Sequence, residues 1–265
     1  MMKNFYSKFT LKKKNIVIIG GSGQLGAKTC EILISAGANV LNLDIFEKRK
    51  LKSKNYSFYK CDITNEIDVE ETKQKINKKF KSIHALINHS HYKGDPKNLK
   101  PFHGFFSKIE NYSTSIWKQT INVNLNGLFF TTRSFLPMLL KNKKSVILNT
   151  SSTYGKVSPN KSIYGNSGIN SPIGYATTKS AIIGFTKYLA CHYADKGLRA
   201  NILVPGGILN LKQKSKFIKN YEKLTPLGKM SNVSDYMETV LFMISDASSY
   251  MTGAEVVVDG GFTSW

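Results

Sequence analysis

Residues 16–26 read IVIIGGSGQLG, an apolar run followed directly by a glycine-rich turn. Four apolar residues in a row are typical of a buried strand, and the residues after the turn continue as a helix to about Ala36. Glycines permit a tight turn and let a diphosphate approach the backbone, and the N–H groups of the helix N-terminus point at it. The same turn also occurs as an ordinary strand-to-helix connection, so its surroundings decide between the two interpretations.

The second expected strand, residues 40–43, ends at Asp44, 18 residues after Gly26. A carboxylate at this place accepts hydrogen bonds from an adenosine ribose and repels a 2′-phosphate. Neither the glycine-rich turn nor the residues directly after Asp44 contain a basic side chain. The sequence therefore predicts a dinucleotide site that prefers NAD over NADP.

Strand-like and helix-like segments alternate along the rest of the chain. Further strands are expected at residues 57–60, 85–87, 146–148, 199–204 and 255–258, with helices at 65–80, 115–141, 180–193 and 233–245. This order predicts an α/β fold: a single-domain Rossmann fold with a doubly wound parallel sheet of about seven strands, flanked by helices on both faces. Residues 1–14 are a basic lead-in, and residues 15–265 form the one dinucleotide-binding domain.

Two kinds of segment in this plan are irregular. The helix at residues 115–141 is apolar on more than one face, and a subunit interface is one reason for that pattern. It contains Asn124 and Asn126, which are poor helix formers, so we expect a local distortion or a polar role there. Residues 92–113 and 159–172 are expected to be loops, and residues 209–223 a mobile flap.

The pentad at residues 175–179 reads YATTK and places Tyr175 and Lys179 four residues apart at a helix start. Residues at this spacing project together from one helix face. An ammonium beside a phenol favours the phenolate, which would lower the pKa of Tyr175 from about 10 towards neutrality. Such a tyrosine exchanges a proton with an alcohol or a carbonyl. Alone, the pair is also common on solvated helix faces.

The formal net charge is +21, from 38 Lys and Arg against 17 Asp and Glu. Only Arg49, Arg133 and Arg199 are arginines, and the lysines are scattered along the chain. Readers of nucleic acid favour arginine forks, so we interpret the charge as compositional drift and expect no nucleic-acid partner. A general attraction for anionic small molecules is consistent with it.

Three widely spaced cysteines, Cys30, Cys61 and Cys191, fit neither a disulfide framework nor a metal cluster. This use of cysteine indicates the reducing cytoplasm. We expect no signal peptide and no membrane span, because no apolar stretch is long enough. His89, His91 and His103 could suggest a metal site, but they lack acidic partners at ligand spacing, so no metal is expected.

Taken together, these motifs resemble the short-chain dehydrogenase/reductase family in its single-domain branch, from Asn15 to Gly261. The resemblance implies catalytic roles for Asn124, Ser152, Tyr175 and Lys179. It implies cofactor contacts from Gly20, Ser22, Gly23, Gln24, Leu25, Gly26, Asp44, Asp62, Ile63, Asn88, Tyr175, Lys179, Pro205, Gly206, Gly207 and Ile208. Substrate contacts are expected from His89, His91, Ser152, Tyr154, Tyr164 and Tyr175.

The chain departs from the family pattern in three places. Ile19 and Gln24 stand where this branch usually has threonine and glycine, which gives the glycine spacing of the family's extended branch. Residues 88–91 keep only the first residue of their motif, which places His89 and His91 towards the nicotinamide or the substrate. Ser152 and Tyr175 are 23 residues apart, some ten more than is common, and the extra segment at 159–172 is expected to build substrate specificity.

The longer insertion is similar to bacterial oxidoreductases of flagellin-modification and surface-sugar gene clusters. This likeness implies hydride transfer between NAD and a secondary alcohol or ketone of a sugar, sugar phosphate or nucleotide sugar, in a cytoplasmic homotetramer or homodimer. Two alternatives stay open: a non-catalytic NAD-binding scaffold or sensor on the same fold, and a sugar epimerase that keeps its NAD bound. Nucleic-acid binding rests on charge alone.

Overall fold

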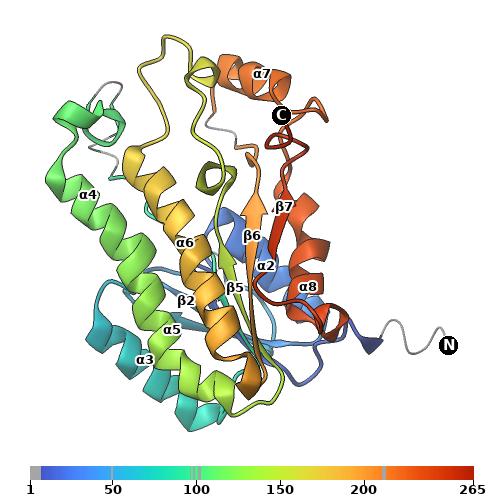
Figure 1. Ribbon diagram of the computed structural model, residues 1–265. Coiled ribbons are helices and arrows are strands. Elements are labelled where there is room, and N and C mark those ends of the chain that lie inside the picture. The colour runs from blue at the N-terminus through green and yellow to red at the C-terminus, as the bar shows by residue number, and fades with distance from the viewer. Residues whose placement is uncertain (1–6, 49, 96, 98, 101–102, 211–212) are drawn as a thin grey trace.

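A seven-stranded, entirely parallel sheet forms the centre of the molecule, in the order β3-β2-β1-β4-β5-β6-β7 (Figure 1). The computed structural model describes residues 7–48, 50–95, 97, 99–100, 103–210 and 213–265. The strands are β1 Asn15–Ile19, β2 Asn39–Asp44, β3 Tyr56–Lys60, β4 Ala85–Asn88, β5 Ser145–Thr150, β6 Leu198–Pro205 and β7 Glu255–Val258. This architecture confirms the predicted α/β fold with a doubly wound parallel sheet.

Helices cover both faces of the sheet, which explains why the strands are apolar without alternation. In β1, Val17 and Ile19 belong to one core cluster, whereas Ile16 and Ile18 belong to the other. Each fully buried side chain of this size contributes about 1.5–3 kcal/mol. The run of four apolar residues therefore contributes two side chains to the core on each face of the sheet.

Three helices lie on the first face: α3 Glu66–Lys79, α5 Gly127–Leu140 and α6 Ile173–His192. The other face is covered by α2 Gln24–Ser35 and α8 Met237–Ile244, which pack against each other (Figure 1). Leu11, from the lead-in, is fully buried in that second cluster and donates its N–H to Ala36. Residues 1–6 of the lead-in lie outside the described residues.

The helix expected at residues 115–141 is divided into three parts. α4 Thr114–Ile121 leads into a π-helical segment, Asn122–Asn126, and α5 follows it. Gly127 donates its N–H to the carbonyl of Asn122, five residues back, as a π-helix requires. The long helix and the local distortion predicted from Asn124 and Asn126 are both confirmed.

The flap expected at residues 209–223 contains a helix instead, α7 Ser215–Lys223. Asn220 of this helix donates to the carbonyls of Ser162 and Ile163 in the 159–172 insertion. This part of the expected flap is therefore a packed helix, because apolar side chains on one side of α7 pack against the insertion. Residues 211 and 212 of the expected flap, and residues 96, 98, 101 and 102 of the 92–113 loop, lie outside the described residues.

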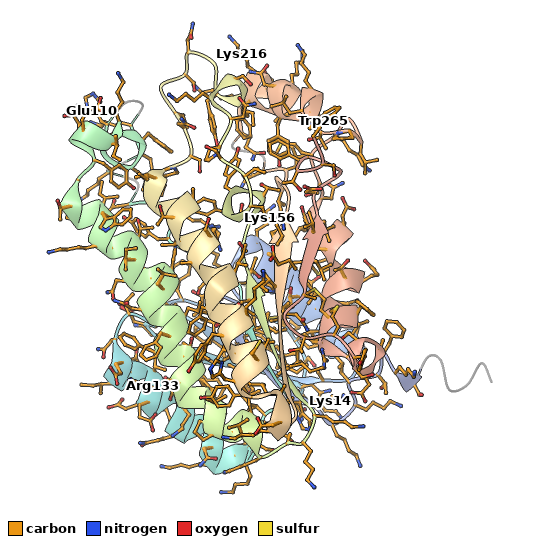
Figure 2. The ribbon with its side chains drawn as sticks, viewed as in Figure 1. Lys14, Glu110, Arg133, Lys156, Lys216 and Trp265 are labelled. Carbon is orange, nitrogen blue, oxygen red and sulfur yellow. The ribbon has the colours of Figure 1, made fainter. Side chains whose placement is uncertain are left out.

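Basic side chains are spread over the molecule rather than gathered on one element. The labelled Lys14, Lys156, Lys216 and Arg133 lie on different parts of the surface (Figure 2). Within the described ranges, every helix is too short or too polar to cross a membrane.

Candidate active site

The glycine-rich turn joins β1 to α2 with almost no room for side chains. Gly20 has a φ of +78°, and a Cβ there would lie 2.9 Å from the backbone of Ser90. A Cβ on Gly26 would lie 2.2 Å from the carbonyl oxygen of Gly20. Gly23 is the N-cap of α2 and provides no side-chain cap, so the N–H groups of the first turn remain available to an anion. This cradle fits a diphosphate.

Asp44 lies beside the turn, at the end of β2. Its Oδ2 accepts a hydrogen bond of 2.9 Å from the N–H of Ser22, and its Oδ1 accepts one of 2.8 Å from Ile45. Ser22 is held in turn by Asn42, whose Nδ2 donates a hydrogen bond of 3.2 Å to Ser22 Oγ. The carboxylate is thus fixed at the place where a ribose is expected.

Lys93, which the sequence interpretation did not consider, lies in the same neighbourhood. Partial burial lowers the pKa of Lys93, the charge of Lys48 lowers it further, and Asp44 raises it. The three groups are therefore close in space, although Lys93 follows β4 and lies far from Asp44 in the sequence. A cation near Asp44 is the feature that could weaken discrimination against a 2′-phosphate.

Asn88 ends β4 next to β1, where the strand order of the sheet reverses. Its Nδ2 donates to Asn149 Oδ1 at 2.7 Å, whereas its buried Oδ1 has no partner among the described residues. In open parallel sheets, dinucleotides bind at the point where the order reverses. An unpartnered acceptor beside a glycine cradle fits such a ligand.

Asp62 and Ile63 follow β3 and differ in surroundings. The exposed Asp62 accepts hydrogen bonds of 2.9 Å and 2.7 Å from the N–H and hydroxyl of Thr64. Ile63 is buried, and a Cβ on Gly127 would lie 2.7 Å from its side chain. The side chain of Ile63 therefore packs on α5, and only Asp62 keeps polar atoms at the surface.

Tyr175 and Lys179 come together on α6, as the spacing predicts. Lys179 is 1% exposed, its Nζ donates to the carbonyl of Thr150 at 2.8 Å, and it lies 5.7 Å from the centre of the Tyr175 ring. Burial lowers the pKa of Lys179 to about 7. Burial raises the pKa of Tyr175, and a hydrogen bond with Ser152 opposes that rise. The pKa of Tyr175 thus shifts in the direction opposite to the prediction, because removal from water is the largest cause and the desolvated Lys179 does not counteract it.

Ser152 lies two residues after the end of β5, and this position brings its side chain beside Tyr175. Its Oγ accepts a hydrogen bond of 3.2 Å from the N–H of Tyr154, and the residue is 7% exposed. The neighbouring Ser151 donates to the carbonyl of Lys179 at 2.7 Å, which joins the strand end to α6. Ser152, Tyr175 and Lys179 therefore form one constellation.

Asn124 lies in the π-helical segment and connects two other parts of the site. Its Oδ1 accepts a hydrogen bond of 2.7 Å from the N–H of Tyr92, and its Nδ2 donates to Thr178 Oγ1 at 2.9 Å. The side chain therefore clamps the loop after β4 to α6, with both of its polar atoms engaged.

The two histidines after β4 have different surroundings. His89 lies inside the fold, with Nε2 3.1 Å from Thr29 Oγ1 and Nδ1 2.7 Å from Thr150 Oγ1. Burial lowers its pKa to about 3, which keeps the ring neutral. The substrate contact predicted for His89 was wrong, because both ring nitrogens are already engaged by the protein.

His91 is the histidine that reaches the reacting tyrosine. Its ring meets the Tyr175 ring edge to face, with the ring centres 6.0 Å apart. Burial lowers the pKa of His91 to about 3, and the charge of Lys179 lowers it further. A neutral imidazole thus stands where the family pattern has the end of its motif.

Five aromatic residues, which we call the aromatic cover, lie above this constellation: Tyr154, Tyr164, Phe217, Tyr221 and Phe262. The hydroxyls of Tyr154 and Tyr164 are 3.5 Å apart, and the rings of Tyr221 and Phe262 stack at 4.8 Å. Burial raises the pKa of Tyr154 and of Tyr164, and the charge of a deprotonated Tyr175 raises both further, so both phenols lie near it. Sequence reasoning found Tyr154 and Tyr164 but missed the other three, which come from α7 and the chain end.

The segment after β6 closes the other side of the site. Gly206 donates its N–H to Val258 at 2.9 Å, and Gly207 donates to the hydroxyl of Tyr221 at 2.6 Å. Ile208 pairs with Ser231 in an isolated bridge. Pro205 is the last residue of β6, rather than the residue that breaks it.

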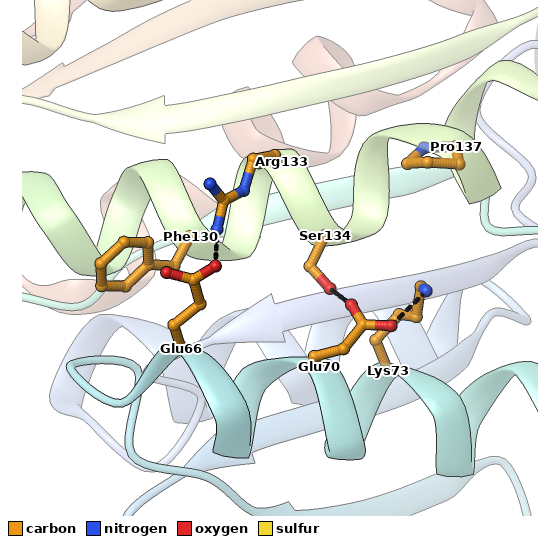
Figure 3. Close-up of a pocket in the computed structure, with 7 residues that line it drawn as sticks. All are labelled: Glu66, Glu70, Lys73, Phe130, Arg133, Ser134 and Pro137. Atoms are coloured by element: carbon orange, nitrogen blue, oxygen red, sulfur yellow. Dashed lines mark hydrogen bonds and ion pairs between the residues drawn. The ribbon is translucent and has the colours of Figure 1, made fainter.

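A groove between α3 and α5 lies outside this constellation (Figure 3). Glu70 in that groove accepts hydrogen bonds of 2.7 Å from both Lys73 and Ser134, and Glu66 pairs with Arg133. Its charged groups therefore already bind one another. In the part of the chain that the structure describes, no three His, Cys, Asp or Glu side chains gather to hold a metal ion.

The fold and these groups together define an oxidoreductase that works with a dinucleotide: a phosphate cradle, a ribose acceptor, and a tyrosine–lysine–serine constellation at the same edge of the sheet. A family model described as enoyl-(acyl carrier protein) reductase matches residues 22–263. The chain belongs to the short-chain dehydrogenase/reductase family.

Relatives support this assignment over the whole chain. A short-chain dehydrogenase from Leptospira borgpetersenii with bound NAD⁺ is 35% identical, with a TM-score of 0.87 over 99% of this chain and 97% of that one. A 3-oxoacyl-(acyl-carrier-protein) reductase from Thermotoga maritima is 30% identical, covering 95% of this chain and 98% of its own. The ligand-free aldohexose dehydrogenase of Thermoplasma acidophilum is 26% identical, with a TM-score of 0.80 over 96% of each chain.

Proposed function

We propose that this oxidoreductase transfers a hydride between NAD(H) and a secondary alcohol or ketone of a sugar, sugar phosphate or nucleotide sugar. The observation that carries the proposal is the meeting of Ser152, Tyr175 and Lys179 at the strand edge that also holds the glycine cradle. When bound, the nicotinamide supplies or accepts the hydride, and the protein supplies position and protons.

In the reduction direction, Tyr175 donates its proton to the carbonyl oxygen of the substrate. Burial keeps the Tyr175 phenol protonated at neutral pH, so the proton to be donated is present. Because a raised pKa also makes the phenol a weaker acid, the hydrogen bond with Ser152 and the nearby Lys179 have to favour release of that proton. Ser152 hydrogen-bonds the same oxygen and stabilises the charge that develops on it. Lys179, with a pKa of about 7, is positioned to return a proton towards Tyr175 near neutrality.

The preference for NAD over NADP rests on Asp44. Its carboxylate is fixed by Ser22 and Ile45, so a 2′-phosphate would have to approach a negative charge that has little freedom to move away. The related Leptospira dehydrogenase, which binds NAD⁺, is consistent with this preference. Lys48 and Lys93 act in the opposite direction, since both would attract the extra phosphate.

The sugar-like substrate is supported by the groups that surround Tyr175. The phenols of Tyr154 and Tyr164 and the neutral imidazole of His91 are uncharged hydrogen-bonding groups with ring faces. Such groups bind the hydroxyls of a polar ring and pack on its apolar face. The likeness to an aldohexose dehydrogenase agrees with this class. Lysines on the nearby α7, including Lys216 and Lys219, suit a phosphate on the far end of the substrate.

Two further parts of the proposal concern the setting of the enzyme. We place it in surface-glycan or flagellin-modification biosynthesis in the cytoplasm, on the strength of the sequence likeness described above. A homodimer or homotetramer is proposed because α5 exposes Phe129 and α6 exposes Tyr188 on their outer faces.

The first experiment is a calorimetric titration of the purified protein with NADH and, separately, with NADPH. Tighter binding of NADH supports the role of Asp44, and Asp44→Ser should then improve NADPH relative to NADH by about tenfold or more, since one charge repulsion is removed. If the wild-type protein prefers NADPH, the assignment of Asp44 fails while the reductase remains. Binding of neither in folded protein contradicts the proposed function.

The second experiment screens sugars, sugar phosphates and nucleotide sugars as substrates. Turnover is measured as the change in NADH absorbance. Turnover of a sugar with stoichiometric change in NADH supports the substrate class. Conversion of a sugar without net change in NADH identifies an epimerase instead.

A further inference from the structure

Gln24 occupies the position where the single-domain branch usually has glycine, and its side chain is used. It is the first residue of α2, directly after the N-cap Gly23. The side chain is exposed, and its Nε2 donates a hydrogen bond of 2.9 Å to the carbonyl of Leu209. This bond joins residues that are 185 positions apart in the sequence.

Leu209 belongs to the segment that follows β6. Besides the bond to Gln24, this segment is hydrogen-bonded to Ser231. The N–H of Leu209 donates to the carbonyl of Ser231 at 2.8 Å, and Ser231 donates to the carbonyl of Gly207 at 3.1 Å. Beyond it, the side chain of Gln213 donates to the carbonyl of Ile208 at 3.3 Å. Residues 207–209 therefore form an ordered strip with one side on the protein body and the other facing Gln24.

The strip comes close to the glycine-rich turn because Ser231, to which it is bonded, lies just before the 3-10 helix Val233–Tyr236, and that helix packs on α2. Gln24 belongs to the phosphate cradle, and Leu209 belongs to the segment that follows β6. Both lie at the carboxyl edge of the sheet. A diphosphate held at the N-terminus of α2 would lie between these two walls. A glycine at position 24 could not make this connection, since it has no side chain.

We propose that Gln24 is a latch residue: its amide ties residues 207–209 to the glycine-rich turn across the bound diphosphate and slows release of the dinucleotide. This inference rests on the proposed function, because it assumes that a dinucleotide occupies the cradle. Gln24 positions the strip and does not take part in the proton or hydride transfer. It lengthens the residence of the dinucleotide within each turnover, and release of the spent dinucleotide then requires this bond to open.

The test compares Gln24→Met with the wild-type protein. Methionine has nearly the same length and keeps the helix, but it cannot donate a hydrogen bond. The matched control is Gln74→Met, which makes the same chemical change on the exposed face of α3, where Gln74 donates to Glu70 at 3.4 Å. Circular dichroism of all three proteins checks that the fold is kept.

The first measurement uses the protein without cofactor. Trypsin cleavage after Lys214 and Lys216, which follow the strip, is timed by mass spectrometry of the fragments. Loss of the latch in Gln24→Met should speed cleavage several-fold, whereas Gln74→Met should match the wild type.

The second measurement is the dissociation rate of NADH, followed by fluorescence when an excess of NAD⁺ is mixed in by stopped flow. One lost hydrogen bond should raise this rate by about three- to tenfold in Gln24→Met and leave the association rate within about twofold. An unchanged dissociation rate overturns the proposal. A faster dissociation with unchanged cleavage also overturns it, because Gln24 would then contact the cofactor without holding the strip.

Failure of the proposed function is a separate outcome. If neither NADH nor NADPH binds to the folded wild-type protein, the dinucleotide assignment fails, and with it the cofactor-retaining role. The cleavage rates still report whether Gln24 holds residues 207–209.

Discussion

The polar groups under the carboxyl edge of the sheet differ from those of the aromatic cover above it. Under the edge, Asn88, His89, Asn149, Thr150 and Lys179 form what we call the edge network, in which protein groups bind one another at 2.7–2.9 Å. In the cover, Tyr221 accepts a hydrogen bond of 2.6 Å from Gly207, but the hydroxyls of Tyr154 and Tyr164, which lie nearest Tyr175, meet only loosely, at 3.5 Å.

This difference separates the groups that hold the catalytic residues in place from the groups that can bind a substrate. Groups that satisfy one another inside a fold are expensive to disturb and hold a geometry. Groups that are buried near a reacting residue but weakly engaged are available to a ligand. Tyr175 lies at the boundary, since α6 joins it to the edge network while His91 and the cover surround its ring.

The largest expected effect is at that boundary. Tyr175→Phe removes the only hydroxyl assigned to proton transfer, so turnover of the substrate found in the screen should fall by about 10³-fold or more. Affinity for NADH, measured by calorimetry, should stay within about twofold. Tyr250→Phe, at a fully exposed tyrosine outside the site, is the control and should keep full activity. Retained activity in Tyr175→Phe would remove the assignment.

The next effect concerns the charge inside the edge network. The pKa of Lys179 is lowered from 10.5 to about 7 in the folded protein, so between these values the unfolded state binds a proton that the folded state lacks. Stability should therefore rise with pH from about 7 to 10, by about a few kcal/mol at most from this group.

Lys179→Met should remove this rise. The measurement is the melting temperature at pH 6.5, 8 and 9.5, and the wild type should gain several degrees that the variant does not gain. Lys118→Met, an exposed lysine of α4, should behave as the wild type. Equal slopes in all three proteins would show that Lys179 keeps an ordinary pKa.

His89 and His91, both in the loop after β4, test the comparison between the edge network and the aromatic cover. His89→Ala leaves the buried hydroxyls of Thr29 and Thr150 without their partner and opens a cavity, which should cost about 2–4 kcal/mol. The melting temperature should fall by roughly 5–10 °C for a chain of this size.

His91→Ala should affect activity more than stability, because this ring meets Tyr175 edge to face and contacts the edge network only through a hydrogen bond with the backbone of His89. The melting temperature should change by less than about 2 °C, while kcat/KM falls by about tenfold, near the upper value for one aromatic contact. If His91→Ala is the less stable variant of the two, the division between network and cover is misplaced.

The smallest effect is expected in the cover. Tyr164→Phe keeps the ring and removes one hydroxyl, so KM for the substrate should rise by about three- to tenfold while kcat stays within about twofold. Tyr250→Phe is the control, because that side chain is fully exposed. A fall in kcat with unchanged KM would place Tyr164 in the chemistry rather than in substrate recognition.

Much of the fold could be predicted from the sequence because its signals are local. The strand and turn at residues 16–26 carry their own geometry, and Asn65 caps α3 by accepting hydrogen bonds from the N–H groups of Ile67 and Asp68. The π-helical segment was detectable because two asparagines are poor residues for a helix interior. These features depend on neighbours a few residues away.

The parts that were missed depend on contacts between distant segments. The sequence does not indicate that His89 would lie between Thr29 and Thr150, nor that Lys93 would approach Asp44. α7 was mistaken for a flap because its lysines hide a short apolar face, Phe217 and Tyr221, whose partner is an insertion of this chain. The pKa of Tyr175 depends on burial, which spacing alone does not determine.

The π-helical segment at Asn122–Asn126 has a consequence for how this chain tolerates change. A π-helical turn contains one residue more than an α-helical turn but covers nearly the same rotation and rise. Deleting one residue there would therefore restore a regular α-helix and leave α5 in its present orientation relative to α4. Phe135, Met138 and Leu139 would still pack on the sheet. The extra residue instead determines where Asn124 points, so a one-residue gap at Asn122–Asn126 is the place where a relative with a regular helix would align.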